Sequence, residues 1–198
     1  GLRGDNMAKK EDVTKFAAKI YDEANRLSKL VEDIMQLSKL DNGITDKEKE
    51  KIELDVLVNN VVDSLNSCLI EKNIFLDTDL NKVEMYAIND IIYSVIYNLV
   101  DNAIKYNKLG GSIKISTCQE KDKAILVVSD TGIGIPKDSI DRIFERFYRV
   151  DKSHSRNIGG TGLGLSIVKH SALIHNAKID VTSELNKGTT IKITFPLI

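Results

Sequence analysis

Apolar positions recur with a helical period between Met7 and Leu40, a stretch without glycine or proline. The apolar stripe repeats every seven residues and again three residues further on, at Val13, Ile20, Leu27 and Ile34 and at Phe16, Leu30 and Leu37. This pattern predicts one long amphipathic helix with a coiled-coil-like seam. Such a helix can pack on its own domain, but a seam of this length needs a long partner, and the later sequence offers none. We therefore favour a helix of a hairpin or dimer bundle, with its partner upstream of Gly1 or in a second chain.

The pattern changes after Asp41-Asn-Gly43, whose turn chemistry ends the helix. We expect three parts: the bundle helix over 1–43, a charged linker over 44–50 and a second domain over 51–198. Strands are predicted over 51–54, 74–80, 85–87, 113–118, 124–129, 179–183 and 189–195, the last two joined at Gly188. Helices are predicted over 55–69, 91–105, 136–146 and 163–175, with Asp55 and either Asn89 or Asp90 as N-caps. Helices and strands in blocks predict an α+β fold, a two-layer α/β sandwich with a mixed sheet.

Composition narrows the class of protein. The net charge of −1 argues against nucleic acid as the main partner, because phosphate backbones select strongly basic surfaces. No apolar run approaches the roughly 20 residues that a membrane-spanning helix needs. Cys68 and Cys118 stand outside any CxxC pattern, and the three histidines lack the neighbours of a zinc site. A reducing compartment without structural zinc is the simplest interpretation.

The first candidate for chemistry lies on the helix predicted over 91–105. Asn98, Asn102 and Lys105 follow each other at spacings of four and three, so they share one helical face, and Tyr106 comes next. Neutral amide oxygens suit magnesium, which relies on water and substrate phosphates for its other ligands. Lys105 can meet a phosphate as a point charge, and Tyr106 can lie along a flat base. The alternative is that these are solvated residues of a helix surface.

The second candidate follows a predicted buried strand, in the segment Asp130-Thr-Gly132-Ile-Gly134-Ile135-Pro. A carboxylate at a strand end can accept a hydrogen bond from the exocyclic amine of adenine. Gly132 and Gly134 allow the backbone to approach a ligand closely. The alternative is an ordinary tight turn, for which Asp-Thr-Gly is common chemistry.

The third candidate is a glycine-rich entry into the predicted helix 163–175, Gly160-Thr161-Gly162-Leu163-Gly164. The free N–H groups of a helix start favour phosphate. The segment does not follow a strand and lacks the GxxxxGK[ST] pattern, so neither a dinucleotide fold nor a P-loop is indicated. Arg149 and Arg156 flank the preceding polar loop and can reach a phosphate, unless they are simply solvated.

Together these segments resemble the catalytic region of sensor histidine kinases of two-component systems, in the ATPase superfamily of gyrase, Hsp90 and MutL. NLVDNAIKY is similar to the N box, DTGIGIP to the G1 box, GGTGLGL to the G2 box and Gly188-Thr189-Thr190 to the last glycine motif. The segment from Ile143 to Arg149 is similar to the F box. The resemblance covers about 51–198, and the bundle helix is similar to the second helix of the dimerisation and phosphotransfer hairpin.

The resemblance implies a role for each matched residue, with ATP and Mg²⁺ as ligands. Asn98, Lys105 and Arg149 would serve catalysis, and Asn102 would hold the metal with help from Asn98. The remaining cofactor-binding positions would be Tyr106 along the base, Asp130 on the adenine amine, and Gly132, Gly134, Ile135, Arg156, Gly160, Thr161, Gly162, Leu163, Gly164 and Thr189 around the nucleotide. Residues 151–160 would form the lid over ATP.

Asn98 separates kinase from hydrolase within this superfamily. The ATP-hydrolysing relatives carry a glutamate four residues before the metal asparagine, and that residue activates water. An amide cannot take a proton. The site is then better suited to transfer of the γ-phosphate to an imidazole than to hydrolysis.

One departure from the family concerns the phosphate acceptor. The histidine motif of the family is missing, and none of His154, His170 and His175 lies on the bundle helix. We expect part of a longer protein that begins after the first hairpin helix. Its expected partners are a response regulator and a second copy bound through the N-terminal helix, at the cytoplasmic face of a membrane in which the full-length protein is anchored. A nucleotide-binding regulatory module without transfer activity is the alternative, and a superfamily ATPase is disfavoured by Asn98.

Overall fold

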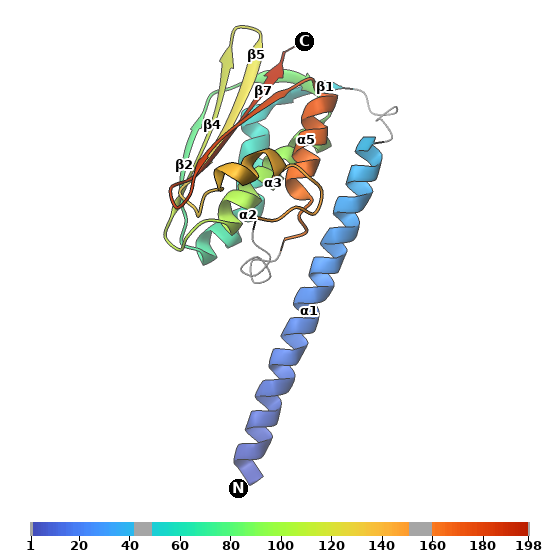
Figure 1. Cartoon of the computed structure of the whole chain (residues 1–198), viewed down its shortest axis with the longest axis vertical. Coiled ribbons are helices and arrows are strands. Elements are labelled where there is room, and N and C mark those ends of the chain that lie inside the picture. The colour runs from blue at the N-terminus through green and yellow to red at the C-terminus, as the bar shows by residue number, and fades with distance from the viewer. Residues whose placement is uncertain (1, 42–48, 151–159, 198) are drawn as a thin grey trace.

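The computed structural model describes residues 2–41, 49–150 and 160–197, with side chains from Val13 onward. Its helices are α1 (Leu2–Asp41), α2 (Leu54–Glu71), α3 (Asn89–Lys105), the 3₁₀ helix η1 (Lys137–Arg142) and α5 (Gly164–Ile174). Its strands are β1 (Glu50–Glu53), β2 (Phe75–Leu80), β3 (Glu84–Ala87), β4 (Ser112–Glu120), β5 (Lys123–Asp130), β6 (Lys178–Glu184) and β7 (Gly188–Pro196). Figure 1 shows α1 extending away from a body formed by the other elements.

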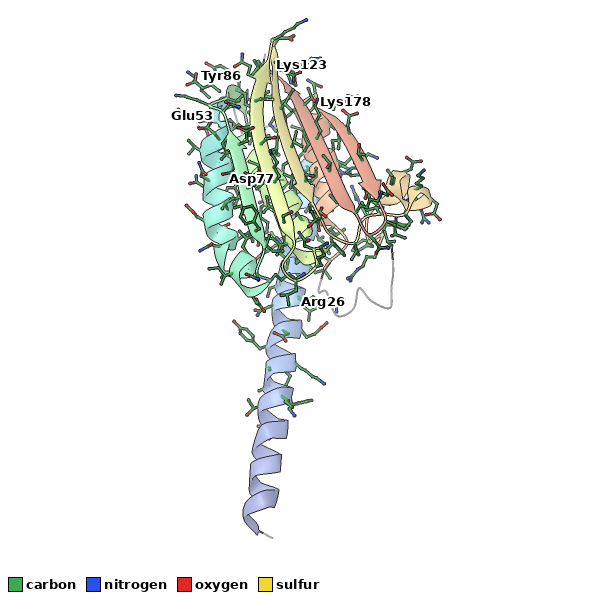
Figure 2. The ribbon with its side chains drawn as sticks, turned by 90° about the vertical axis from the view of Figure 1, so that its left-hand side faces the viewer. Arg26, Glu53, Asp77, Tyr86, Lys123 and Lys178 are labelled. Atoms are coloured by element: carbon green, nitrogen blue, oxygen red, sulfur yellow. The ribbon has the colours of Figure 1, made fainter. Side chains whose placement is uncertain are left out.

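A five-stranded mixed sheet forms one layer of this body. Its order is β2-β4-β5-β7-β6, with β2 and β4 parallel and the other neighbours antiparallel. Helices α2, α3 and α5 cover one face of the sheet (Figure 1), and Asp77 on β2 lies on the opposite face (Figure 2). The short strands β1 and β3 form a separate antiparallel pair. The predicted two-layer α/β sandwich with a mixed sheet is therefore confirmed.

The core lies between the sheet and helices α2 and α3. Ile92, Ile96 and Leu99 of this helix are buried in the same cluster as Leu126 of β5 and Ile193 of β7. Period-2 burial in the strands and period-3.6 burial in the helix are the patterns of elements that each turn one face to a common core. The helix that carries Asn98 and Asn102 is thereby fixed against the strand that ends in Asp130.

Two details of the helices differ from the sequence prediction. Asp55 was expected to cap α2, but α2 begins at Leu54, and Asp55 accepts a hydrogen bond from the Val83 N–H at 3.3 Å. Helix α3 likewise begins at Asn89 without a side-chain cap at its N-cap residue, Ile88. Backbone bonds explain the first difference, since the Leu54 N–H already donates to the Val83 carbonyl at 2.9 Å and fixes the chain entry.

The helix predicted over 136–146 is shorter than expected. Only the 3₁₀ turn Lys137–Arg142 forms, with Pro136 as its N-cap residue. Further along, Phe147 takes a positive φ of 62° and its N–H donates to the Gly162 carbonyl at 2.9 Å. This pairing with a segment distant in the sequence overrides the local helical preference.

Helix α1 packs on the body only through its C-terminal part. Leu37 and Leu40 are buried in a cluster with Ile88, Leu163 and Ile167. Further towards the N-terminus the apolar seam is exposed, as at Phe16, which is 67% exposed. Within the part of the chain that the structure describes, no helix combines the length and the apolar character needed to cross a bilayer.

Buried His175 joins the end of α5 to the start of α3. Its Nε2 accepts the Ile88 N–H at 3.1 Å, and its Nδ1 donates to the Ser171 carbonyl at 2.8 Å. Burial lowers the pKa of His175, and the bond to Ser171 opposes this change. The neutral ring thus acts as a fixed connector within the scaffold rather than as a ligand of the site described below.

The segment after β5 lies on the β6–β7 hairpin. The Ile135 N–H donates to Ser183 Oγ at 2.8 Å, and the Asn186 N–H donates to the Ile133 carbonyl at 2.7 Å. Gly134 lies between them with a φ of 67°, and a Cβ at this position would clash with the Glu184 carbonyl oxygen. The glycine therefore allows two stretches of protein backbone to approach each other.

We predict that Gly134→Ala lowers the free energy of unfolding by about 2–4 kcal/mol, because left-handed strain adds to the clash with Glu184. Gly110→Ala is the matched control, since Gly110 has a φ of 71° and open space around its missing Cβ. Strain alone predicts a loss of about 1–2 kcal/mol there. Urea denaturation of both variants measures the difference. Equal losses would show that the approach of the two backbones is not tight.

Candidate functional site

Two adjoining cavities lie between α3, the end of β5 and the glycine-rich segment before α5. The larger one, of about 450 Å³, is mainly apolar and contains Asp130 in its wall. The smaller one, of about 110 Å³, is lined by polar residues of α3 and of the glycine segment. Asn102, Tyr106, Ile143, Tyr148 and Leu165 line both cavities. The two spaces therefore form one site with an apolar end and a polar end.

Asp130 is the polar group of the apolar end. Its Oδ1 accepts hydrogen bonds from the backbone N–H groups of Gly132, at 2.7 Å, and Thr189, at 3.3 Å. Burial raises the pKa of the Asp130 carboxyl, and these two hydrogen bonds oppose the rise. Because Oδ1 accepts both backbone hydrogen bonds, Oδ2 is the oxygen that can accept a hydrogen bond from a ligand.

Asn98 and Asn102 lie one turn apart on α3, and both line the polar cavity. Asn98 is buried, and its Nδ2 donates to the Ser94 carbonyl at 2.8 Å. Its Oδ1 faces the start of α5, where a Cβ at Gly164 would lie 2.7 Å from that oxygen. Asn98 thus contacts protein on both sides of its amide, whereas Asn102 lies at the junction of the two cavities.

Charged side chains surround the polar end. Lys105 forms an ion pair with Asp101 at 2.6 Å, and both residues line the polar cavity. Arg149 lines the apolar cavity, and its Nη1 donates to the Gly160 carbonyl at 2.9 Å. The arginine thereby ties its own segment to the start of the glycine segment.

Helix α1 also reaches the polar cavity, a feature that sequence reasoning missed. Arg26, Lys29 and Asp33 are part of its lining. Asp33 is buried, and its Oδ2 accepts a hydrogen bond from Thr161 Oγ1 at 2.6 Å. In the sequence, Arg26, Lys29 and Asp33 form a charged row at helical spacing beside the apolar seam. From the sequence alone, such a row cannot be distinguished from the solvated face of a helix.

Most of the predicted site residues come together around the two cavities. The lining includes Asn98, Asn102, Lys105, Tyr106, Gly134, Ile135, Arg149, Gly160, Thr161, Gly162, Gly164 and Thr189 besides Asp130. Gly132 instead lies close to the Tyr106 carbonyl and donates to Asp130. Leu163 is fully buried in the cluster under α1. Arg156 and most of the predicted lid lie outside the described residues.

Other lining residues were not predicted. Sequence reasoning missed Leu99, Ala103, Val128, Leu165, Leu185 and Ile191 around the apolar cavity, as well as Ile143 and Tyr148 near the polar end. Apolar side chains of this kind carry no local signal of a site, because the same residues are typical of a core. Only the three-dimensional packing separates a cavity wall from a core.

Comparison with known proteins places this chain in a family. The family described as histidine kinase-, DNA gyrase B-, and HSP90-like ATPase matches residues 87–198. The chain is 37% identical over 177 residues to the sensor histidine kinase RppB of Synechocystis sp., a match that covers 88% of this chain and 39% of that protein. It is 35% identical over 187 residues to the sensor-like histidine kinase SenX3 of Mycolicibacterium smegmatis, covering 94% of this chain and 49% of that protein. The chain therefore spans less than half the length of either relative.

The fold comparison agrees with the sequence comparison. The solved structure of the Acinetobacter baumannii histidine kinase AdeS superposes with a TM-score of 0.72 at 26% identity, covering 86% of this chain and 78% of that one. The family match extends over α3, the end of β5 and the glycine segment, whereas α1, which also lines the polar cavity, lies outside it. The chain belongs to the histidine kinase-, DNA gyrase B-, and HSP90-like ATPase family, and it carries the catalytic domain of the sensor histidine kinase type.

Proposed function

We propose that this chain binds ATP with Mg²⁺ and forms the catalytic part of a two-component sensor kinase that phosphorylates a histidine. The observation that carries the proposal is the position of Asp130. A carboxylate held by two backbone N–H groups in the wall of an apolar cavity is suited to a flat ligand with one hydrogen-bond donor.

Adenine fits the apolar end. A volume of about 450 Å³ lies within the range of ligand pockets, and Leu99, Ile133 and Ile135 supply apolar walls. Tyr106 provides an aromatic ring at the junction with the polar end. In the proposed complex Asp130 Oδ2 accepts a hydrogen bond from the exocyclic amine. A purine with a carbonyl at that position would instead face the carboxylate with a second acceptor.

The phosphates and the metal fit the polar end. The glycine segment from Gly160 to Gly164 leads into α5, whose free N–H groups and positive end favour phosphate. The Asn102 amide oxygen is a hard neutral ligand of the kind that suits Mg²⁺, and we assign it the metal. Asn98 supports this position from the next turn. When bound, the metal would neutralise phosphate charge, and Lys105 would add a cation at the same end. Arg149, bound to the Gly160 carbonyl, would reach the phosphates from the apolar side.

The residues at the polar end favour transfer over hydrolysis. Asn98 is fixed by Ser94 and by the start of α5, and its amide has no basic site with which to activate water. In the proposed reaction an imidazole nitrogen forms the new bond to the γ-phosphorus while the bond to the bridging oxygen breaks, and ADP leaves. The acceptor histidine would come from a helix packed on the seam of α1.

The exposed seam of α1 supports the proposed partner. Phe16 and Ile20 are 67% and 57% exposed, and Leu27 continues the same stripe. Apolar residues at this spacing are typical of a helix bundle. We propose that they pair with a hairpin helix and a second copy of the chain. The family further suggests a response regulator as the final acceptor and attachment of the full-length protein to the cytoplasmic face of a membrane.

We predict that Asp130→Asn weakens ATP binding by about ten- to a hundredfold, the range of a lost hydrogen bond to a charged group. The new amide can keep the bonds from Gly132 and Thr189 through its oxygen, so its NH₂ group would face the adenine amine. Calorimetry with Mg²⁺-ATP measures the change. Asp77→Asn, at an exposed aspartate on the far side of the sheet (Figure 2), is the control and leaves the affinity unchanged.

The same carboxylate predicts a pH dependence. Because burial raises the pKa of Asp130, protonation begins at a higher pH than for an ordinary aspartate. ATP affinity should be highest well above that pKa and decline as the pH falls through it, because the protonated carboxyl is a weaker hydrogen-bond acceptor than the carboxylate. Asp130→Asn should lack this decline. Identical pH profiles for both proteins would remove Asp130 from the adenine site.

We also predict that Asn102→Ala abolishes the increase in ATP affinity that Mg²⁺ produces, because the metal loses its protein ligand. Affinities measured with Mg²⁺ and with a chelator should then agree within about twofold. Asn60→Ala, at an exposed asparagine of α2, is the control and keeps the metal dependence. A variant that retains the full Mg²⁺ effect would refute the assignment of Asn102.

A further inference from the structure

We infer that Lys29 of α1 binds the phosphates of the nucleotide, so that the helix outside the family match completes the polar end of the site. This inference rests on the proposed function and adds to it a binding residue from α1. Its basis is the lining of the polar cavity, in which α1 lies opposite α3 and the glycine segment.

Contacts on one face of α1 hold this helix beside the cavity. Asp33 Oδ2 accepts from Thr161 Oγ1 at 2.6 Å, and one turn on Gln36 Nε2 donates to Ser94 Oγ at 2.7 Å. Leu37 and Leu40 then continue this face into the buried cluster on α5. These contacts are spaced three to four residues apart, so the same face, extended by one turn towards the N-terminus, presents Lys29.

Charge is the reason why α1 matters to an anionic ligand. Among the described residues that line the polar cavity, α3 contributes one cation and one anion, Lys105 and Asp101, which form an ion pair. Helix α1 contributes two cations, Arg26 and Lys29, and one anion, Asp33. The excess positive charge of this lining therefore comes from α1. A triphosphate carries several negative charges and is attracted to such an excess.

Lys29 is better placed than Arg26 to make the contact. Its Nζ lies 3.2 Å from Asp33 Oδ1 and 5.4 Å from the centre of the Tyr97 ring, so it stands between α1 and α3. Its side chain is 42% exposed, so rotation towards a phosphate does not require a change in the core. Arg26 instead pairs with Glu23 on the same helix and lies where α1 emerges from the body (Figure 2).

Asp33 does not prevent Lys29 from turning to a phosphate. Its carboxylate is directed at the Thr161 hydroxyl, and that hydrogen bond remains when Lys29 turns away. Thr161 is itself part of the glycine segment, so Asp33 holds α1 against the loop that would surround the phosphates. The bond between Asp33 and Thr161 holds α1 beside the phosphates, and a bond from Lys29 to a phosphate would hold α1 there in turn. Phosphate binding and the docking of α1 would therefore stabilise each other.

The test compares the binding of ATP and of adenosine to the full chain by calorimetry in the presence of Mg²⁺. Lys29→Met keeps the length and the apolar stem of the side chain and removes its charge. We expect ATP affinity to fall about three- to tenfold, the range of a partly exposed charged contact, while adenosine affinity stays the same. Lys29→Arg keeps the charge and should keep most of the ATP affinity.

Lys19→Met is the matched control, because Lys19 is an exposed lysine on the same helix further from the cavity. It should change neither affinity. Circular dichroism and the adenosine affinity show that each variant is folded.

Unchanged ATP affinity in Lys29→Met would overturn the inference, and so would a gain, which would mean that docked α1 hinders the phosphates. Equal losses for Lys29→Met and Lys29→Arg would show that charge is not the cause, with the same conclusion. If the wild-type chain bound neither ATP nor adenosine, the proposed function itself would be refuted. Failure of the inference and failure of the proposed function therefore give different results.

Discussion

The Asp130 carboxylate and the two backbone N–H groups that hold it are the constraint on which the site depends. Gly132 follows the end of β5, and Thr189 lies at the start of β7. The sheet order brings these strands together, and Leu99 of α3 and Leu165 of α5 line the cavity beside them. A half-buried charge is tolerated there because it is hydrogen-bonded. The two hydrogen bonds that allow Asp130 to be half-buried thus also leave its second oxygen available to the proposed ligand.

The polar end of the site has a different origin. It is built from one face of α3, the start of α5 and a face of α1, elements that meet through apolar contacts such as Leu37 with Leu163 and Ile167. Its charges are already paired before a ligand arrives, Lys105 with Asp101 and Lys29 with Asp33. A phosphate would therefore exchange one anionic partner for another, which favours reversible binding over tight capture.

The sequence predicted the sandwich because helical and strand periods are local signals, and it predicted polar and glycine residues of the cavity lining because they stand in short local motifs. It predicted the short 3₁₀ turn wrongly, since the pairing of Phe147 with Gly162 depends on residues distant in the chain. It also attributed Gly132 and Gly134 to the approach of a ligand, whereas their tight contacts are with the Tyr106 and Glu184 carbonyls. The part played by Asp33 was invisible, because a carboxylate on a charged helix face becomes informative only when Thr161 lies against it.

The central claim is that an ionised Asp130 selects a purine by the amine at its sixth position. Calorimetry of the wild-type chain with ATP and with inosine triphosphate, which carries a carbonyl at that position, tests it most directly. The two ligands share the ribose, the phosphates and the metal, so the comparison isolates the contact with Asp130. We predict that ATP binds at least about a hundredfold more tightly, because the carbonyl would leave two acceptors facing each other. Equal affinities would contradict the account.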